Sequence, residues 1–179
     1  MTLYVAFLRG INLGKRQMKM AELRDCLEAE GYGEVKTILA SGNVRFATEG
    51  KEDEIASSLE TIMEKRFGFE VGVVLRTVEF LSQLVASDPF ARLDPNADAT
   101  RHVLFSAQDL PEGLNLIDRP GHTEIVGMGP REIFIAGYRQ PNGRYTEGVE
   151  EVLKPLYKRV GKGHLDTMRN WNTIEKVIP

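Results

Sequence analysis

The fold is decided by a stretch near the start of the chain, Tyr4-Val5-Ala6-Phe7-Leu8-Arg9-Gly10-Ile11-Asn12-Leu13-Gly14-Lys15. Its apolar first part predicts a buried strand over residues 3–8. The strand runs into a glycine-containing polar loop that also carries Arg16 and Lys19, and no acid stands between Arg9 and Lys19. Backbone N–H groups and fixed positive charge at the edge of a sheet suit an anionic ligand.

The elements that follow this strand predict a ferredoxin-like unit. Apolar residues at helical spacing indicate helices over 18–30 and 52–67, each followed by a glycine. Strand patterns cover 35–40, 44–47 and 71–75, and Ser41-Gly42-Asn43 is expected to form a hairpin turn. The resulting order is β-α-β-β-α-β.

The second half repeats this order of elements without a detectable sequence repeat. Thr77 is expected to cap a connecting helix that runs to about Ala86, and a polar stretch with two prolines follows. Strands are predicted over 103–106, 122–128, 131–136 and 165–168, and helices over 111–117 and 147–160. We therefore predict an α+β protein with two ferredoxin-like lobes, a structural duplication. The N-terminal lobe is expected over 1–87, a linker over 88–99 and a C-terminal lobe over 100–179.

The predicted topology brings two polar loops together. A right-handed crossover makes the second strand parallel to the first, so the loops that follow these strands open at the same end of the sheet. The candidate ligand-binding residues at this edge are Arg9, Gly10, Asn12, Gly14, Lys15, Ser41, Gly42 and Asn43. Arginine would pair with the anion, glycine N–H groups would surround it, and the asparagines would orient it. The alternative is structural: solvated lysines in a connecting loop, and a turn built from residues that tolerate positive φ.

A third stretch, Arg169-Asn170-Trp171-Asn172-Thr173, has an unusual composition. Asn172 and Glu175 have the spacing of a capping box, which predicts a short helix over 173–177. Trp171 is expected to be a packed anchor for the end of the chain. Arg169 and Asn170 remain as further candidates for ligand binding.

Bulk properties exclude several classes of protein. The chain has 179 residues, of which 42% are hydrophobic and 27% are charged, and these values are typical of a globular protein. A net charge of −3 argues against broad nucleic-acid affinity, although a local basic patch is compatible with it. A single cysteine forms no intrachain disulfide and, with no recognisable signal region, predicts a cytoplasmic protein without membrane association.

No motif in the sequence indicates a catalytic or metal centre. The three histidines are scattered, and neither a Ser/His/Asp set nor paired carboxylates can be assembled from spacing. We expect no cofactor and no metal site, and the sequence leaves both enzymatic activity and oligomeric state undecided.

The chain resembles the bacterial domain of unknown function 1697 family. The resemblance rests on five ordered motifs: Phe7-Leu8-Arg9-Gly10-Ile11-Asn12, Lys19-Met20-Ala21-Glu22-Leu23-Arg24, Ser41-Gly42-Asn43-Val44, Asp88-Pro89-Phe90 and Arg169-Asn170-Trp171-Asn172-Thr173. It implies a compact α+β fold with two ferredoxin-like halves and brings no established activity. Family members often carry a Gly-Arg-Ser-Lys-like stretch before the last long helix. Here Asn142-Gly143-Arg144-Tyr145-Thr146-Glu147 stands instead, without the serine and the lysine.

Three functions remain open at this point. The first is a non-catalytic module that binds an anionic ligand, such as a nucleotide or a short nucleic-acid segment, at the edge from Arg9 to Asn43. The second is an enzyme whose site assembles only in three dimensions. The third is a protein-interaction or structural role.

Overall fold

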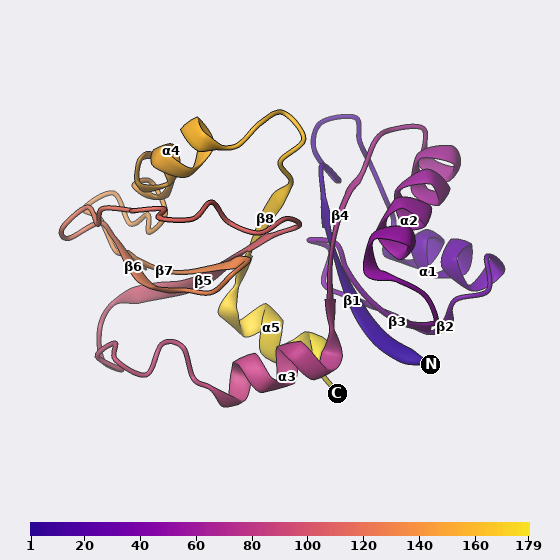
Figure 1. Cartoon of the computed structure of the whole chain (residues 1–179), viewed down its shortest axis with the longest axis horizontal. Helices are drawn as coiled ribbons and strands as arrows, with labels where there is room; N and C mark the ends of the chain where they lie inside the picture. The colour runs from indigo at the N-terminus through magenta and orange to yellow at the C-terminus, as the bar shows by residue number, and fades with distance from the viewer. The chain divides into compact units, whose positions relative to one another are not determined.

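The computed structural model describes residues 1–179 as two units. The first unit comprises Met1–Gln83 with Lys176–Pro179, and the second comprises Leu84–Glu175. Each unit contains one four-stranded antiparallel sheet and its helices (Figure 1). The predicted α+β class with two ferredoxin-like sheets is therefore confirmed.

The first unit has the predicted β-α-β-β-α-β order. Its elements are β1 (Thr2–Arg9), α1 (Met20–Ala29), β2 (Gly33–Ile38), β3 (Asn43–Thr48), α2 (Glu52–Phe67) and β4 (Gly72–Thr77). The strands lie in the order β2-β3-β1-β4, and every neighbouring pair is antiparallel. This order makes β1 and β2 parallel without being neighbours, as a ferredoxin-like unit requires.

Helices α1 and α2 cover one face of the first sheet (Figure 1). Alternate residues of β1 point toward them because successive strand side chains point to opposite faces. The core joins these strand residues to the apolar stripes of the two helices: Tyr4, Ala6, Leu8, Leu23, Leu27, Ile55, Leu59 and Met63. Helix α2 ends at Gly68, whose left-handed φ of 82° forms the C-terminal cap.

The second unit repeats the strand order of the first, without a helix between its first two strands. Its strands are β5 (Ala99–Ser106), β6 (Thr123–Met128), β7 (Glu132–Tyr138) and β8 (Asp166–Asn170), with α4 (Val149–Arg159) packed on the sheet and α5 (Trp171–Val177) at the end of the chain. The order β6-β7-β5-β8 is that of the first sheet when β5–β8 replace β1–β4. Helix α3 (Val78–Ala86) connects the two units, and Thr77 caps it by accepting a hydrogen bond from the Phe80 N–H.

One predicted helix is wrong. Residues 111–117 are irregular, and Gly113 adopts a left-handed φ of 67° that interrupts a helix. Leucines 110, 114 and 116 still pack into the core below α4. Their apolar spacing therefore reflects contact with the sheet and not a helical face.

The chain end also differs from the prediction. Helix α5 begins at Trp171, and the N–H of Asn172 donates a hydrogen bond to Asn170 Oδ1 at 2.9 Å. Asn170 is therefore the capping residue, and Asn172 lies inside the helix. Trp171 is buried, as predicted, at 7% exposure, with edge contacts to the rings of Phe90 and Phe134.

Candidate functional site

The loops that follow β1 and β2 meet at one end of the first sheet. The N–H of Leu8 donates to the carbonyl oxygen of Gly42 at 2.8 Å, and Asn12 Nδ2 donates to the carbonyl oxygen of Ala40 at 3.1 Å. The predicted proximity of the two loops is therefore confirmed. The turn itself comprises residues 39–42, one step earlier than expected, because Asn43 is already the first residue of β3.

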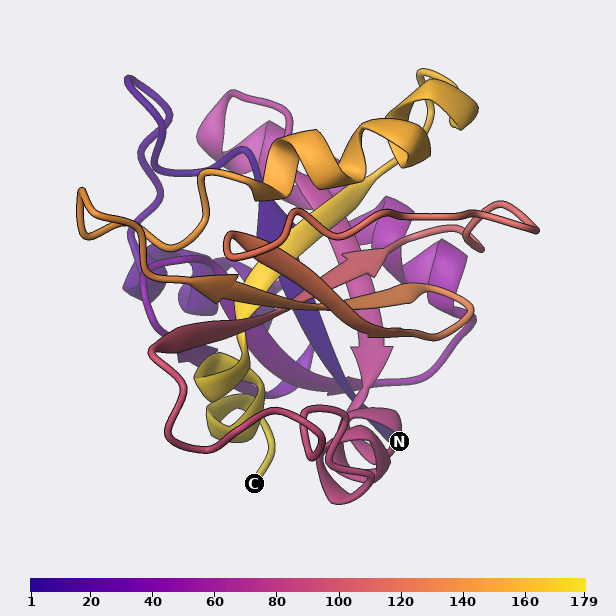
Figure 2. The same cartoon turned by 90° about the vertical axis from the view of Figure 1, so that its left-hand side faces the viewer.

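Asn12 closes the base of the first loop. Its Oδ1 accepts a hydrogen bond from the N–H of Met18 at 2.9 Å, while its Nδ2 holds Ala40. Ile11 and Met18, the residues that bracket the loop, are buried at 8% and 3% exposure. Residues 12–17 between them are all exposed and project beyond the end of β1 (Figure 2). We call residues 12–17 the finger.

The finger has its own internal order. Leu13 and Arg16 form an antiparallel bridge, with the N–H of Arg16 donating to the Leu13 carbonyl oxygen at 2.9 Å. Gln17 Nε2 donates to the carbonyl oxygen of Gly14 at 3.0 Å. A Cβ built on Gly14 would meet no atom within 4 Å, so the tip faces open space.

The cation of Arg16 folds back toward the strand. A Cβ built on Gly10, which has a φ of 84°, would lie 3.4 Å from Arg16 Nη1. The guanidinium therefore occupies the space beside the Gly10 backbone, one residue from Arg9. Arg9, Lys15 and Lys19 are exposed, and the segment from Arg9 to Lys19 contains no acidic residue.

Gly42 and Asn43 have structural tasks at this edge. Asn43 is fully buried and donates from Nδ2 to the carbonyl oxygen of Ile38 at 2.8 Å and to Ser41 Oγ at 3.0 Å. Gly42 packs against Ile11 with a φ of 88°. Of the three turn residues that the sequence singled out, only Ser41 is exposed.

Arg169 and Asn170 belong to the second unit and are also engaged in its structure. Arg169 is 8% exposed, and its Nη1 donates to Thr167 Oγ1 at 2.6 Å and to the Met168 carbonyl oxygen at 3.0 Å. Burial lowers the pKa of this guanidinium to about 10. Asn170 caps α5, and Arg169 is held by Thr167 and Met168. Both residues therefore have structural roles that require no ligand.

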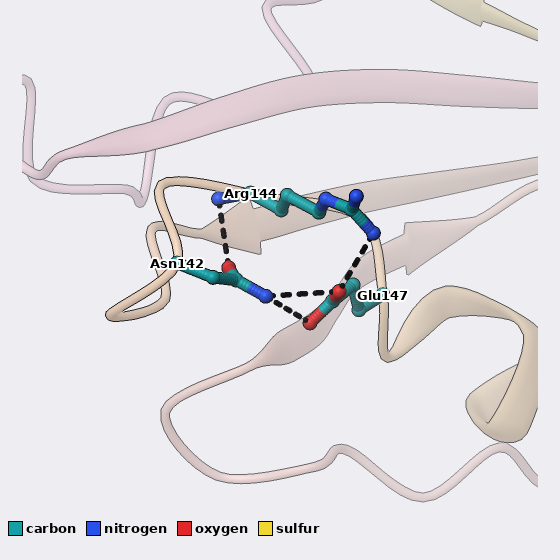
Figure 3. Close-up of polar contacts among 3 residues, drawn as sticks. All are labelled: Asn142, Arg144 and Glu147. Atoms are coloured by element: carbon teal, nitrogen blue, oxygen red, sulfur yellow. Dashed lines mark hydrogen bonds and ion pairs between the residues drawn. The ribbon is translucent and has the colours of Figure 1, made fainter.

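The structure reveals a polar cluster that the sequence motifs did not identify as a site. Glu147 accepts hydrogen bonds from Asn142 Nδ2 to both carboxylate oxygens at 3.0 Å and pairs with Arg144 at 3.3 Å (Figure 3). The N–H of Arg144 donates to Asn142 Oδ1 at 3.0 Å. The hydrogen bond from Asn142 is the main cause that lowers the pKa of Glu147. This closed network orders the turn before α4, in the stretch that departs from the family pattern.

Two kinds of catalytic arrangement, a metal centre and a Ser/His/Asp set, can be compared with the positions of the titratable residues. No group of three or more His, Cys, Asp or Glu side chains is placed to hold a metal ion. His164 pairs with the buried Asp166 at 2.7 Å, and Ser106 lies opposite Asp166 across the strands. The Ser106 hydroxyl, however, donates to the carbonyl oxygen of Gln108 at 2.6 Å. Its proton is therefore not directed toward the histidine, as activation of a nucleophile requires.

Comparisons with known proteins agree with the fold. The family described as "Protein of unknown function (DUF1697)" matches residues 1–134. The conserved bacterial protein SP0830 from Streptococcus pneumoniae has a similar structure, with a TM-score of 0.68 and 23% sequence identity over 98% of this chain and 96% of that one. A comparison with curated proteins finds no match. None of the helices is both long and apolar enough to cross a membrane.

Proposed function

The chain belongs to the DUF1697 family of proteins of unknown function, and we propose that it is a non-catalytic module that binds a phosphate-bearing ligand. The ligand is a nucleotide or a short nucleic-acid segment. The binding surface is the edge of the first sheet where residues 9–19 meet the turn at 39–42.

The observation that carries this proposal is an ordered loop that bears exposed cations and has no acid in its own sequence. The two hydrogen bonds of Asn12 tie the start of the finger to Met18 and to Ala40. Lys15 and Arg16 are exposed on a loop that is held in one shape before any ligand arrives. A preorganised site binds better than a mobile one because less conformational entropy is lost on binding.

The residues divide into two groups in this proposal. Arg9, Lys15 and Arg16 supply charge, and N–H groups near Gly10 and Gly14 complete the anion site. Asn12, Gly42 and Asn43 act indirectly, since their side chains or close contacts shape the two loops. The exposed Ser41 stands on the neighbouring turn, and its Oγ accepts a hydrogen bond from Asn43 Nδ2.

The proposal is tested with a charge-removing double variant, Lys15→Ala with Arg16→Ala. Binding of ATP is measured by isothermal titration calorimetry at two salt concentrations. We expect weak binding by the parent protein, weaker binding at higher salt because the attraction is screened, and loss of binding in the double variant.

The matched control is Lys158→Ala with Arg159→Ala, which removes two exposed cations from the end of α4. It gives the same net charge and should bind ATP like the parent. Equal loss in both variants would mean that total charge, and not the basic loop, attracts the ligand. No binding of ATP or of a short oligonucleotide by the parent protein would overturn the proposal.

A further inference from the structure

Leu13 stands out on the basic loop because it is a large apolar residue with no cover. Its exposure is 64%, among the highest of the large hydrophobic residues in the chain. It occupies the first position of the turn at the tip of the finger, and its backbone pairs with that of Arg16. The side chain is therefore exposed at the tip of a loop that also carries Lys15 and Arg16.

The finger is convex. All six of its residues are exposed, and a Cβ built on Gly14 would meet no atom within 4 Å. Small molecules bind in concave sites that bury most of their surface. The side chains of the finger can be buried only if the finger inserts into, or packs against, a partner larger than itself.

The chemistry of the tip specifies that partner. The Gln17 side-chain amide is already bonded to Gly14, whereas Lys15 and Arg16 carry positive charge in the same loop as the exposed Leu13. The partner must therefore offer anionic groups and a small apolar surface in close alternation. Single-stranded nucleic acid has this repeat, with a phosphate and an uncovered base face in every nucleotide.

We propose that the finger binds single-stranded nucleic acid, with Lys15 and Arg16 at neighbouring phosphates and Leu13 packed on the face of a base. This inference rests on the proposed function and narrows its ligand from any phosphate-bearing molecule to a strand. An anionic membrane surface is less well matched. Stable attachment to a bilayer takes a large apolar face or a second anchor, and the finger offers one leucine.

The test uses fluorescence anisotropy with a labelled 15-nucleotide oligo-dT and a labelled oligo-rU across a range of NaCl concentrations. We expect the parent protein to bind both strands, and ATP to compete only weakly. Leu13→Ala should weaken binding at least about fivefold at every salt concentration, since burial of a leucine side chain contributes on this scale. The slope of log Kd against log salt should remain that of the parent.

The variant with Lys15→Ala and Arg16→Ala should instead lower that slope by about 1.4, because each phosphate contact to a single strand contributes about 0.7. The pair Lys158→Ala and Arg159→Ala, which lies on α4, should keep the parental slope. Melting temperatures of all variants verify that each one is folded. These are exposed positions, so little change in stability is expected.

Four outcomes would overturn the inference. An unchanged affinity of Leu13→Ala would show that the tip makes no apolar contact. If ATP binds as tightly as the oligonucleotides, the proposed function stands, but single-stranded nucleic acid is not the preferred ligand. Capture by vesicles containing phosphatidylserine, without oligonucleotide binding, would assign the finger to membranes. Failure of the parent protein to bind ATP and both strands would end the proposed function as well.

Discussion

Gly42 and Ile11 touch where two loops from distant parts of the sequence cross. A Cβ built on Gly42 would lie 2.5 Å from Ile11 Cδ1, a distance that real Cβ atoms do not adopt. Ile11 is 8% exposed and Leu8, the next nearest contact, is 2% exposed. The crossing is therefore tight enough to make glycine a packing requirement at this position.

Gly42→Ala should destabilise the protein by about 2–4 kcal/mol, because a left-handed φ and an overpacked contact both oppose the added methyl group. Gly14→Ala is the control: it shares the left-handed backbone but meets no neighbour, and it should cost only about 1 kcal/mol. Urea unfolding measures both. Adding Ile11→Val to Gly42→Ala should recover part of the loss, and equal costs for the two glycines would contradict the packing argument.

Asn12→Gly should lower the free energy of unfolding by about 2 kcal/mol, since two hydrogen bonds are lost at about 1 kcal/mol each. Glycine is chosen because Asn12 has a φ of 53°, which glycine adopts without strain. Gln17→Ala removes a bond inside the exposed finger and should change stability by less than about 0.5 kcal/mol. If both variants unfold at the same urea concentration as the parent, Asn12 does not close the loop.

The capping residue of α5 can be identified by comparing two asparagines. Asn170→Ala should cost about 1 kcal/mol, because it leaves the Asn172 N–H without its side-chain acceptor. Asn172→Ala, inside the helix, should cost clearly less. Thermal unfolding of the two variants decides the matter, and the reverse order would restore the capping box that the sequence suggested.

Trp171→Ala should destabilise the protein by about 3–5 kcal/mol, the range for a buried aromatic residue. The ring is 7% exposed and makes edge contacts with Phe90 at 5.2 Å and Phe134 at 6.2 Å between centroids. Tyr157→Ala, at a position that is 43% exposed, provides the comparison and should cost much less. A melting temperature unaffected by the loss of Trp171 would refute an anchoring role.

Acidification should destabilise the protein in part through His102. Burial lowers the pKa of this histidine in the folded state, below the value of about 6.5 expected when unfolded. Between these two pKa values the unfolded state binds more protons, so stability falls as the pH falls through this window. The free energy of unfolding of His102→Gln should therefore depend less on pH between 6.5 and 5. Parallel pH profiles of variant and parent would exclude this contribution.

The regular elements of this fold were predictable because their periodicity reports directly on burial. Helix α2 was predicted with its observed bounds, 52–67, from apolar residues on one stripe and a glycine at the end. The strand β5 was underestimated because its first part is Ala99 followed by the polar residues Thr100, Arg101 and His102, so the apolar signal covers only its second part.

The sequence predicted where the candidate site lies, but not which of its residues are exposed and which hold the loops in place. Topology alone placed Asn12 and Asn43 near each other's loops. Sequence could not reveal that Asn43 is fully buried or that both amides are occupied by backbone groups. An asparagine that binds a ligand and one that closes a turn have the same side chain, and only their partners distinguish them. The burial of Arg169 was not predictable either, because it depends on packing across the whole sheet.

Because the base of the finger is closed, the residues that stabilise the fold are different from the residues at the tip that could contact a partner. Because Asn12 joins Met18 across the six-residue excursion, the side chains at positions 13, 15 and 16 lie outside the hydrophobic core, and substitutions there should cost little stability. Selection on what the tip touches can then proceed without selection on whether the chain folds. Relatives that keep the asparagine and the flanking buried residues are free to diverge at the tip, so preference for a partner could change by a few exchanges on an unaltered scaffold.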